Sequence, residues 1–262
     1  MFARLRAEGR RGLIAYITAG DPSPEDTPEL VWALERGGAD LIELGMPFSD
    51  PIADGPVIQR ATERALRQGM TLEKLLETAA EIRRRSAVPL LLFSYLNPLM
   101  RYGLSRLAAD AAAAGIDGCL LTDLSVEEAG PYVGAVRARG LDTVFLAAPT
   151  STPRRLELVA RYSSGFIYLV SRTGVTGERD SVSGAVGPLV EALRKISSLP
   201  LAVGFGISQP EHVAEIGRIA DAAVVGSAFV RLIERNAGNA SLPVMLESFT
   251  RELKHGFSLR ER

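Results

Sequence analysis

The sequence has little of what several classes of protein require. Cys119 is the one cysteine in its 262 residues, so no disulfide can form within the chain, as expected in a reducing cytoplasm. No apolar run approaches the roughly 18 residues that a membrane-spanning helix needs. The first twelve residues, MFARLRAEGRRG, lack the apolar core of a secretory signal. We therefore expect a soluble, cytoplasmic protein.

Strong charge and metal-ligand clusters are also missing. The formal net charge is −1, which gives no electrostatic attraction to nucleic acid or to an anionic membrane. The two histidines, His212 and His255, lie far apart on expected helices and do not indicate a metal site. All three lysines also fall on expected helices, so no strand offers an amine for a Schiff base.

Short apolar runs are plentiful, and most are followed by a turn and an amphipathic stretch. They are hydrophobic almost throughout, as strands of a parallel sheet covered on both faces should be. The expected strands are 13–18, 39–44, 89–95, 117–122, 143–148, 166–170, 201–205 and 221–226. The expected helices include 71–85, 103–114, 125–139, 153–162, 187–197 and 208–217.

This succession predicts an α/β fold of the (β/α)8 TIM-barrel type. Eight strand–helix units in about 250 residues have the size and rhythm of such a barrel. No linker or low-complexity tract divides the chain, so we expect one domain over residues 1–262. A doubly wound open sheet is the alternative, because the order of elements does not show that a sheet closes.

One expected strand carries an acid among apolar residues. Glu43 lies in LIELG, at the end of strand 39–44, and active sites of barrel enzymes lie at the C-terminal ends of the strands. An apolar setting raises a carboxyl pKa toward the range that is useful for proton transfer. The alternative for Glu43 is a salt bridge to an arginine inside the barrel.

A second acid, Asp54, follows in the Pro-rich loop after the same strand. Its alternative role is to cap a helix that starts near Pro56. Asp50, in the tripeptide SDP, fits a turn role even better. The local pattern barely separates the two aspartates as candidates for chemistry.

Glycine-rich loops predict a phosphate site. VGFGIS (203–208) follows the seventh strand and VGSAFV (225–230) follows the eighth, where barrels commonly bind phosphate with backbone amides. Gly206, Gly226 and Ser227 would give close approach and donors. The long loop 171–184 has the composition of a mobile lid, with plain disorder as the alternative.

Four motifs together resemble the α-subunit family of tryptophan synthase, from about residue 5 to residue 255. They are LIELGMPFSDPIADGPVIQRA, SRTGVTG, VGFGIS and VVGSAFV, in the order and spacing of that family. The resemblance implies retro-aldol cleavage of indole-3-glycerol phosphate to indole and glyceraldehyde 3-phosphate, without a cofactor or metal in this chain. It also implies that Glu43 is the acid–base carboxylate and that Asp54 binds the ring N–H and stabilises positive charge there.

The resemblance implies binding roles for further residues. Tyr168 matches the tyrosine beside the glutamate, and Thr176 matches a lid residue that contacts the loop aspartate. Leu120 and Phe205 match walls of the indole pocket, and Tyr16 stands where the family often has phenylalanine. The residues that match the phosphate site are Gly177, Gly206, Gly226 and Ser227.

A partner is implied as well. Members of this family work in an α2β2 tetramer and pass indole to a pyridoxal-phosphate β subunit, which joins it to L-serine. The loops 46–56 and 171–184 are expected to meet that partner. Three other functions are alternatives: a phosphosugar isomerase or decarboxylase on the same scaffold, a subunit that only activates a partner, and a stand-alone lyase that releases indole.

Overall fold

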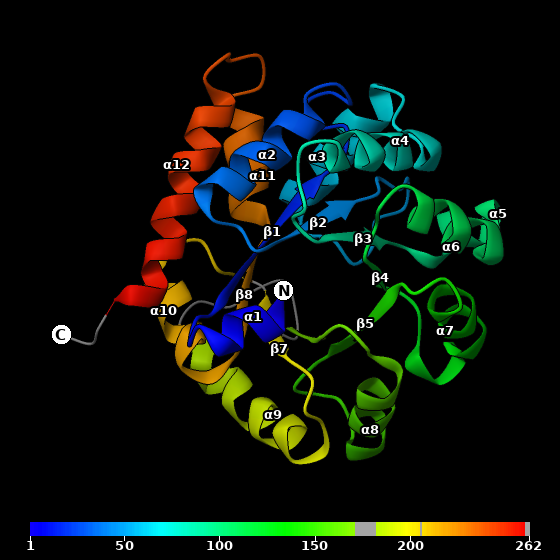
Figure 1. The fold of residues 1–262 in the computed structure, drawn as a ribbon, viewed down its shortest axis with the longest axis vertical. Helices are drawn as coiled ribbons and strands as arrows, with labels where there is room; N and C mark the ends of the chain where they lie inside the picture. The colour runs from blue at the N-terminus through cyan, green and yellow to red at the C-terminus, as the bar shows by residue number, and fades with distance from the viewer. Residues whose placement is uncertain (171–181, 205, 260–262) are drawn as a thin grey trace.

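The protein is a closed barrel of eight parallel strands (Figure 1). The computed structural model describes residues 1–170, 182–204 and 206–259. Each strand pairs with the next, and β1 pairs with β8, which closes the sheet and excludes the open-sheet alternative. The strands are β1 (Gly12–Thr18), β2 (Leu41–Gly45), β3 (Leu90–Ser94), β4 (Gly118–Leu121), β5 (Asp142–Ala147), β6 (Ile167–Val170), β7 (Leu201–Gly204) and β8 (Ala222–Val225).

Helices surround the barrel on its outer side, except α1, whose Phe2 packs against the cluster inside the barrel (Figure 1). They are α1 (Phe2–Ala7), α2 (Thr27–Gly37), α3 (Pro56–Arg67), α4 (Leu72–Arg83), α5 (Leu96–Tyr102), α6 (Leu104–Ala113), α7 (Gly130–Arg137), α8 (Pro153–Tyr162), α9 (Val182–Ile196), α10 (Pro210–Ile219), α11 (Ser227–Arg235) and α12 (Leu242–His255). Two 3₁₀ turns, η1 (Val126–Glu128) and η2 (Gly256–Ser258), complete the described elements. None of the described helices is both long enough and apolar enough to span a membrane.

Two expected helices differ from the structure. The pattern at 125–139 predicts one helix, but the chain forms the turn η1 and then α7, which begins at Gly130–Pro131. Proline lacks an amide donor and therefore suits a first turn, so a new helix begins there. The helix expected at 187–197 begins earlier, at Val182, and runs through Pro188. Residues 182–184 of the expected lid therefore belong to α9.

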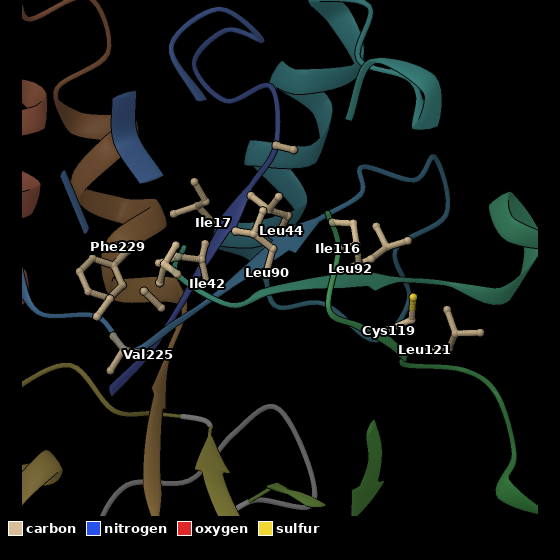
Figure 2. Packing of buried hydrophobic residues seen from close by; sticks show 14 of the residues in the cluster. Ile17, Ile42, Leu44, Leu90, Leu92, Ile116, Cys119, Leu121, Val225 and Phe229 are labelled. Carbon is tan, nitrogen blue, oxygen red and sulfur yellow. The ribbon is translucent and has the colours of Figure 1, made fainter. Parts of the chain in front are cut away.

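The side chains of each strand alternate between two cores. Those that point outward join the helices in a large buried cluster, of which Figure 2 shows a part, with Ile42 and Val225 from strands and Phe229 from α11. Cys119 belongs to this cluster as a small buried residue. The alternate residues point into the barrel and form a second cluster around Leu91 and Leu120. This alternation decides which polar side chains reach the interior.

A repeated contact stabilises the N-terminal end of the barrel. Before β2, β4, β6 and β8, a side-chain oxygen accepts a hydrogen bond from the backbone amide at the start of the preceding strand. The four contacts are Leu13 N to Asp40 Oδ2 (2.8 Å), Leu90 N to Asp117 Oδ2 (2.8 Å), Thr143 N to Ser164 Oγ (3.0 Å) and Leu201 N to Asp221 Oδ2 (2.8 Å). The three aspartates also pair with cations on helices: Lys254, Arg83 and Arg194. These charges serve the end of the barrel opposite the expected site.

Candidate active site

Glu43 points into the barrel from the middle of β2. Its neighbours in the strand register are Tyr16 on β1 and Leu91 on β3. The carboxylate is 1% exposed, and its Oε1 has no hydrogen-bond partner among the described residues. No lysine or arginine in the described part of the chain pairs with it, so the described residues give no support to the salt-bridge alternative. Burial raises the pKa of Glu43 to about 8.

Two tyrosines lie close to this carboxylate. Tyr16 on β1 and Tyr168 on β6 are both buried, and each places its hydroxyl over a glycine of the next strand, Gly45 and Gly204 respectively. A Cβ at either glycine would overlap the tyrosine hydroxyl, so these glycines make room for the two rings. Burial raises the pKa of both hydroxyls, and the charge of Glu43 adds to the rise. Both tyrosines therefore keep their protons.

Asp54 is fixed by a tyrosine from another loop. Tyr95, directly after β3, donates a hydrogen bond from its hydroxyl to Asp54 Oδ2 at 3.0 Å and accepts one from the Ala53 amide at 2.9 Å. The helix α3 is preceded by Gly55 as its N-cap, and Asp54 makes no capping bond to it. The capping alternative is therefore wrong. Burial raises the pKa of Asp54 to about 6, although the hydrogen bond from Tyr95 lowers it in part.

Asp50 has a different setting, which separates the two aspartates. It is exposed, and its carboxylate accepts a hydrogen bond from the neighbouring Ser49 hydroxyl at 2.5 Å. Its backbone carbonyl accepts from the Ile52 amide. Asp50 therefore serves the turn, while Asp54 faces the barrel mouth beside Tyr95.

The two carboxylates thus have different protonation states at neutral pH. Glu43, with a pKa of about 8, holds its proton, while Asp54, with a pKa of about 6, is ionised. The charge of Asp54 raises the pKa of both Tyr16 and Tyr95, which shows that these groups share one electrostatic environment. Two titratable groups with pKa values pushed apart are the usual arrangement for an acid and a base at one site.

Aromatic and aliphatic side chains lie beside these groups inside the barrel. Leu120 is fully buried and pairs in register with Phe93, which stays partly exposed inside the barrel. The Phe93 ring meets Tyr16 edge-on, with centroids 5.1 Å apart and planes at 73°. Phe93 and Tyr95 were not among the predicted site residues. Their alternation in FSY, at the end of an expected strand, is a signal that could have indicated them.

Three of the four predicted phosphate residues, Gly206, Gly226 and Ser227, lie at the same end of the barrel. Gly226 and Ser227 form the N-terminus of α11, whose first turn contains no acidic residue. Gly206 follows β7 with a φ of +78°, a conformation that favours glycine. Gly226 is different: its φ is −118°, and the atoms nearest to an added Cβ would be Cβ, Cδ1 and Cγ of Tyr16, at 3.5 to 3.7 Å. Neither a positive φ nor a close contact in the described structure therefore requires glycine at 226.

Three of the predicted site residues lie outside the described residues. They are Thr176 and Gly177, in the expected lid, and Phe205, after β7. The described residues also contain no group of three or more side chains that could hold a metal ion.

Comparisons with known proteins agree with this geometry. The profile of one family, described as tryptophan synthase alpha chain, matches residues 2–257. A protein of that name from Solibacter usitatus is 71% identical over 260 residues, covering 99% of this chain and 97% of its own. Another from Chloroflexus aurantiacus is 53% identical over 89% of this chain and 88% of its own.

Solved structures give the same result. The alpha subunit from Legionella pneumophila superposes with a TM-score of 0.89 at 34% identity, covering 98% of this chain and 96% of its own. A chain of the tryptophan synthase α2β2 complex from Pyrococcus furiosus superposes with a TM-score of 0.86 at 40% identity. That match covers 92% of this chain and 97% of the other.

Proposed function

This chain belongs to the tryptophan synthase alpha chain family, and from that premise we propose that Glu43 and Asp54 carry its reaction. The chain is a lyase of tryptophan biosynthesis that cleaves indole-3-glycerol phosphate to indole and glyceraldehyde 3-phosphate. The observation that carries the assignment of residues is a buried Glu43, whose Oε1 has no hydrogen-bond partner and whose pKa is about 8, together with an Asp54 whose pKa is about 6; the charges of both raise the pKa of Tyr16.

The chemistry requires a proton to be delivered to carbon. Indole is a poor carbanion leaving group, so Glu43 first protonates ring carbon C3, which makes the ring an indolenine with positive charge on nitrogen. Asp54 accepts a hydrogen bond from the ring N–H and stabilises that charge. Glu43, now ionised, takes the proton of the glycerol hydroxyl next to C3 as the C–C bond breaks. The bonding electrons return to the ring, the hydroxyl carbon becomes an aldehyde, and Glu43 is protonated again.

The remaining site residues are proposed to hold the two ends of the substrate. Tyr16, Leu120 and Tyr168 would contact the apolar ring, for which a pocket with aromatic walls is suited. Backbone amides near Gly206 and at Gly226–Ser227 would bind the phosphate, because a helix N-terminus attracts anions. By family resemblance, Phe205 would add to the ring pocket, Gly177 to the phosphate site, and Thr176 would contact Asp54.

We also propose that the chain is a single domain over residues 1–262 that works in the cytoplasm with a tryptophan synthase β subunit. The α2β2 complex of the Pyrococcus furiosus relative supports such a partner. Pyridoxal phosphate is expected in the β subunit only, since the carboxylate chemistry above asks for no cofactor in this chain. Ile52, 87% exposed and two residues from Asp54, supplies an apolar contact in the loop expected to meet the partner.

An indole-release assay on the purified chain tests the assignment. Glu43→Gln keeps the shape of the side chain and removes proton transfer, so we expect activity to fall by about 100- to 10,000-fold. Circular dichroism and binding of an uncleaved substrate analogue should stay unchanged. If more than about a tenth of the activity survives in a folded variant, Glu43 is not the proton donor.

A further inference from the structure

We infer that Arg64 is a positioning residue that keeps the two ends of the substrate site in register. The inference rests on the proposed function, because it concerns the distance between the ring end, at Asp54, and the phosphate end, at Gly226–Ser227. Arg64 touches neither end. It connects the elements that carry them.

Arg64, on α3, forms a forked contact with a buried aspartate. Its Nε and Nη2 atoms each donate to one carboxylate oxygen of Asp21, both at 2.8 Å. Asp21 lies in the loop after β1 and is 1% exposed. A planar guanidinium that meets a carboxylate through two parallel bonds is held in one orientation, which a lysine could not reproduce.

The third Arg64 nitrogen reaches a different helix. Its Nη1 donates to Glu234 Oε1, on α11, at 2.8 Å. Arg60, one turn earlier on α3, also binds this glutamate. Its Nε donates to Glu234 Oε1 at 2.7 Å, and its Nη2 donates to Oε2 at 2.8 Å. Glu234 therefore receives three hydrogen bonds from α3, and Arg64 ties α3 to both the β1 loop and α11.

Both helices begin at the candidate site. Asp54 lies just before the first residue of α3, and Gln59 on α3 donates to the Asp54 carbonyl at 2.8 Å. Ser227 is the first residue of α11. Ala61 on α3 and Val230 on α11 pack in one small cluster with Tyr16. The distance between the ring end and the phosphate end therefore depends on how α3 packs against α11. The ion pairs of Arg60 and Arg64 with Glu234 fix that packing.

This arrangement has a consequence that ordinary destabilisation lacks. A ligand that spans both ends gains affinity only when the ends are correctly spaced, because its second contact is intramolecular. A ligand that fills one end does not depend on the spacing. Loss of Arg64 should therefore weaken spanning ligands selectively.

The experiment measures equilibrium binding of three ligands by the full chain, at a temperature well below melting. The ligands are indole, glycerol 3-phosphate, and an indole joined at C3 to a propyl phosphate. For Arg64→Met we expect affinity for the joined ligand to fall by about tenfold or more, while each single-end ligand changes by less than about twofold. Arg67→Met is the matched control, since Arg67 lies on the same helix, is 79% exposed at its side chain, and should change none of the three.

A second variant covers the case in which Arg64→Met does not fold. Glu234→Gln keeps the Asp21–Arg64 contact and weakens only the link to α11, so it should show the same selective loss to a smaller degree. Equal losses for all three ligands, or no loss for the joined ligand, in the variant that folds would overturn the inference. If the wild-type chain binds neither indole nor glycerol 3-phosphate, the proposed function itself fails.

Discussion

At the residue scale, the chemistry depends on how differently the fold treats two carboxylates. Glu43 is in the strand interior, with no hydrogen-bond partner for Oε1 among the described residues, whereas Asp54 has Tyr95. Burial without a partner favours the neutral acid, and a donated hydrogen bond favours the ionised one. The same residue types, both fully in water, would be ionised at neutral pH.

The pKa values predict a bell-shaped dependence of kcat/KM on pH. Below about 6, Asp54 takes up a proton and no longer balances charge on the ring nitrogen. Above about 8, Glu43 loses the proton that C3 requires. We expect activity to fall on both sides of that window. In Asp54→Asn, the fall on the acid side should disappear and the fall on the alkaline side should remain. A profile without a fall near pH 8 would contradict the role of Glu43.

Stability provides an independent check on Glu43. Its pKa is raised from about 4.5 when unfolded to about 8 when folded, so the folded state binds the proton more tightly. The resulting stabilisation is complete below the unfolded pKa and is lost as pH rises through the folded one. The melting temperature should therefore fall between pH 5 and pH 9, measured by circular dichroism, and should fall less in Glu43→Gln.

Asp54 and Asp50 form a matched pair for mutation. Asp54→Asn leaves a neutral amide where the ring nitrogen needs a negative charge, and such electrostatic losses commonly cost about 100- to 1,000-fold in rate. Asp50→Asn changes an exposed turn residue that contacts Ser49, and we expect less than about a threefold effect, which corresponds to less than about 0.65 kcal/mol. Steady-state cleavage rates compare the two. Equal, small effects would reduce Asp54 to a loop residue.

At the scale of elements, the site is built where helices begin. The start of α11 carries the backbone amides of Gly226 and Ser227, and α3 begins two residues after Asp54. The opposite end of the barrel carries the repeated aspartate contacts. The fold thus places catalysis at one end and much of its charged stabilisation at the other, as TIM barrels generally do.

Gly226→Ala tests the phosphate end with the smallest possible change. The φ of −118° at Gly226 lies outside the left-handed range, and an added methyl would make ordinary van der Waals contact with Tyr16, at 3.5 to 3.7 Å. Phosphate would lose close approach to the amides, and a hydrogen bond to a charged group contributes about 1.5–3 kcal/mol. We expect KM to rise by about 10- to 100-fold with little change in melting temperature. Unchanged binding of glycerol 3-phosphate would place the phosphate elsewhere. Gly206 is a poorer position for this substitution. At its φ of +78° an alanine would strain the backbone, and a loss of binding could then come from that strain.

At the scale of the whole molecule, the site opens on the loop that we expect a partner to contact. Asp54 shares its loop with the exposed Ile52, so a β subunit pressing on that loop would change the position of Asp54. Contacts that favour one loop position couple binding to activity, typically by about 1–3 kcal/mol. We expect a cognate β subunit to raise the cleavage rate by about tenfold and to co-elute in gel filtration. No co-elution, or a full rate from the chain alone, would favour a stand-alone lyase.

An exposed apolar residue on another element gives the control for this interface. Ile52→Asp should weaken co-elution with the β subunit, because it places a charge in an apolar contact. Val244→Asp, on α12 at 67% exposure, changes an equally apolar surface away from the loop and should leave co-elution intact.

The sequence by itself determined the strands, the regular alternation of strands and helices, and the presence of a carboxylate in a hydrophobic strand. These are local features: strand alternation fixes that Glu43 shares a face with Leu41, and burial of that face fixes a raised pKa. The family motifs then assigned roles that spacing alone left open between Asp50 and Asp54.

Only the tertiary structure decided which distant residues meet. Tyr95 reaches Asp54 from 41 positions away, and Arg64 reaches Asp21 and Glu234 from 43 and 170 positions away. The same holds for closure, since the pairing of β1 with β8 joins the two ends of the sheet. Local patterns report which face a side chain takes, but contacts between elements depend on how the whole barrel curves, and no short stretch of sequence contains that information.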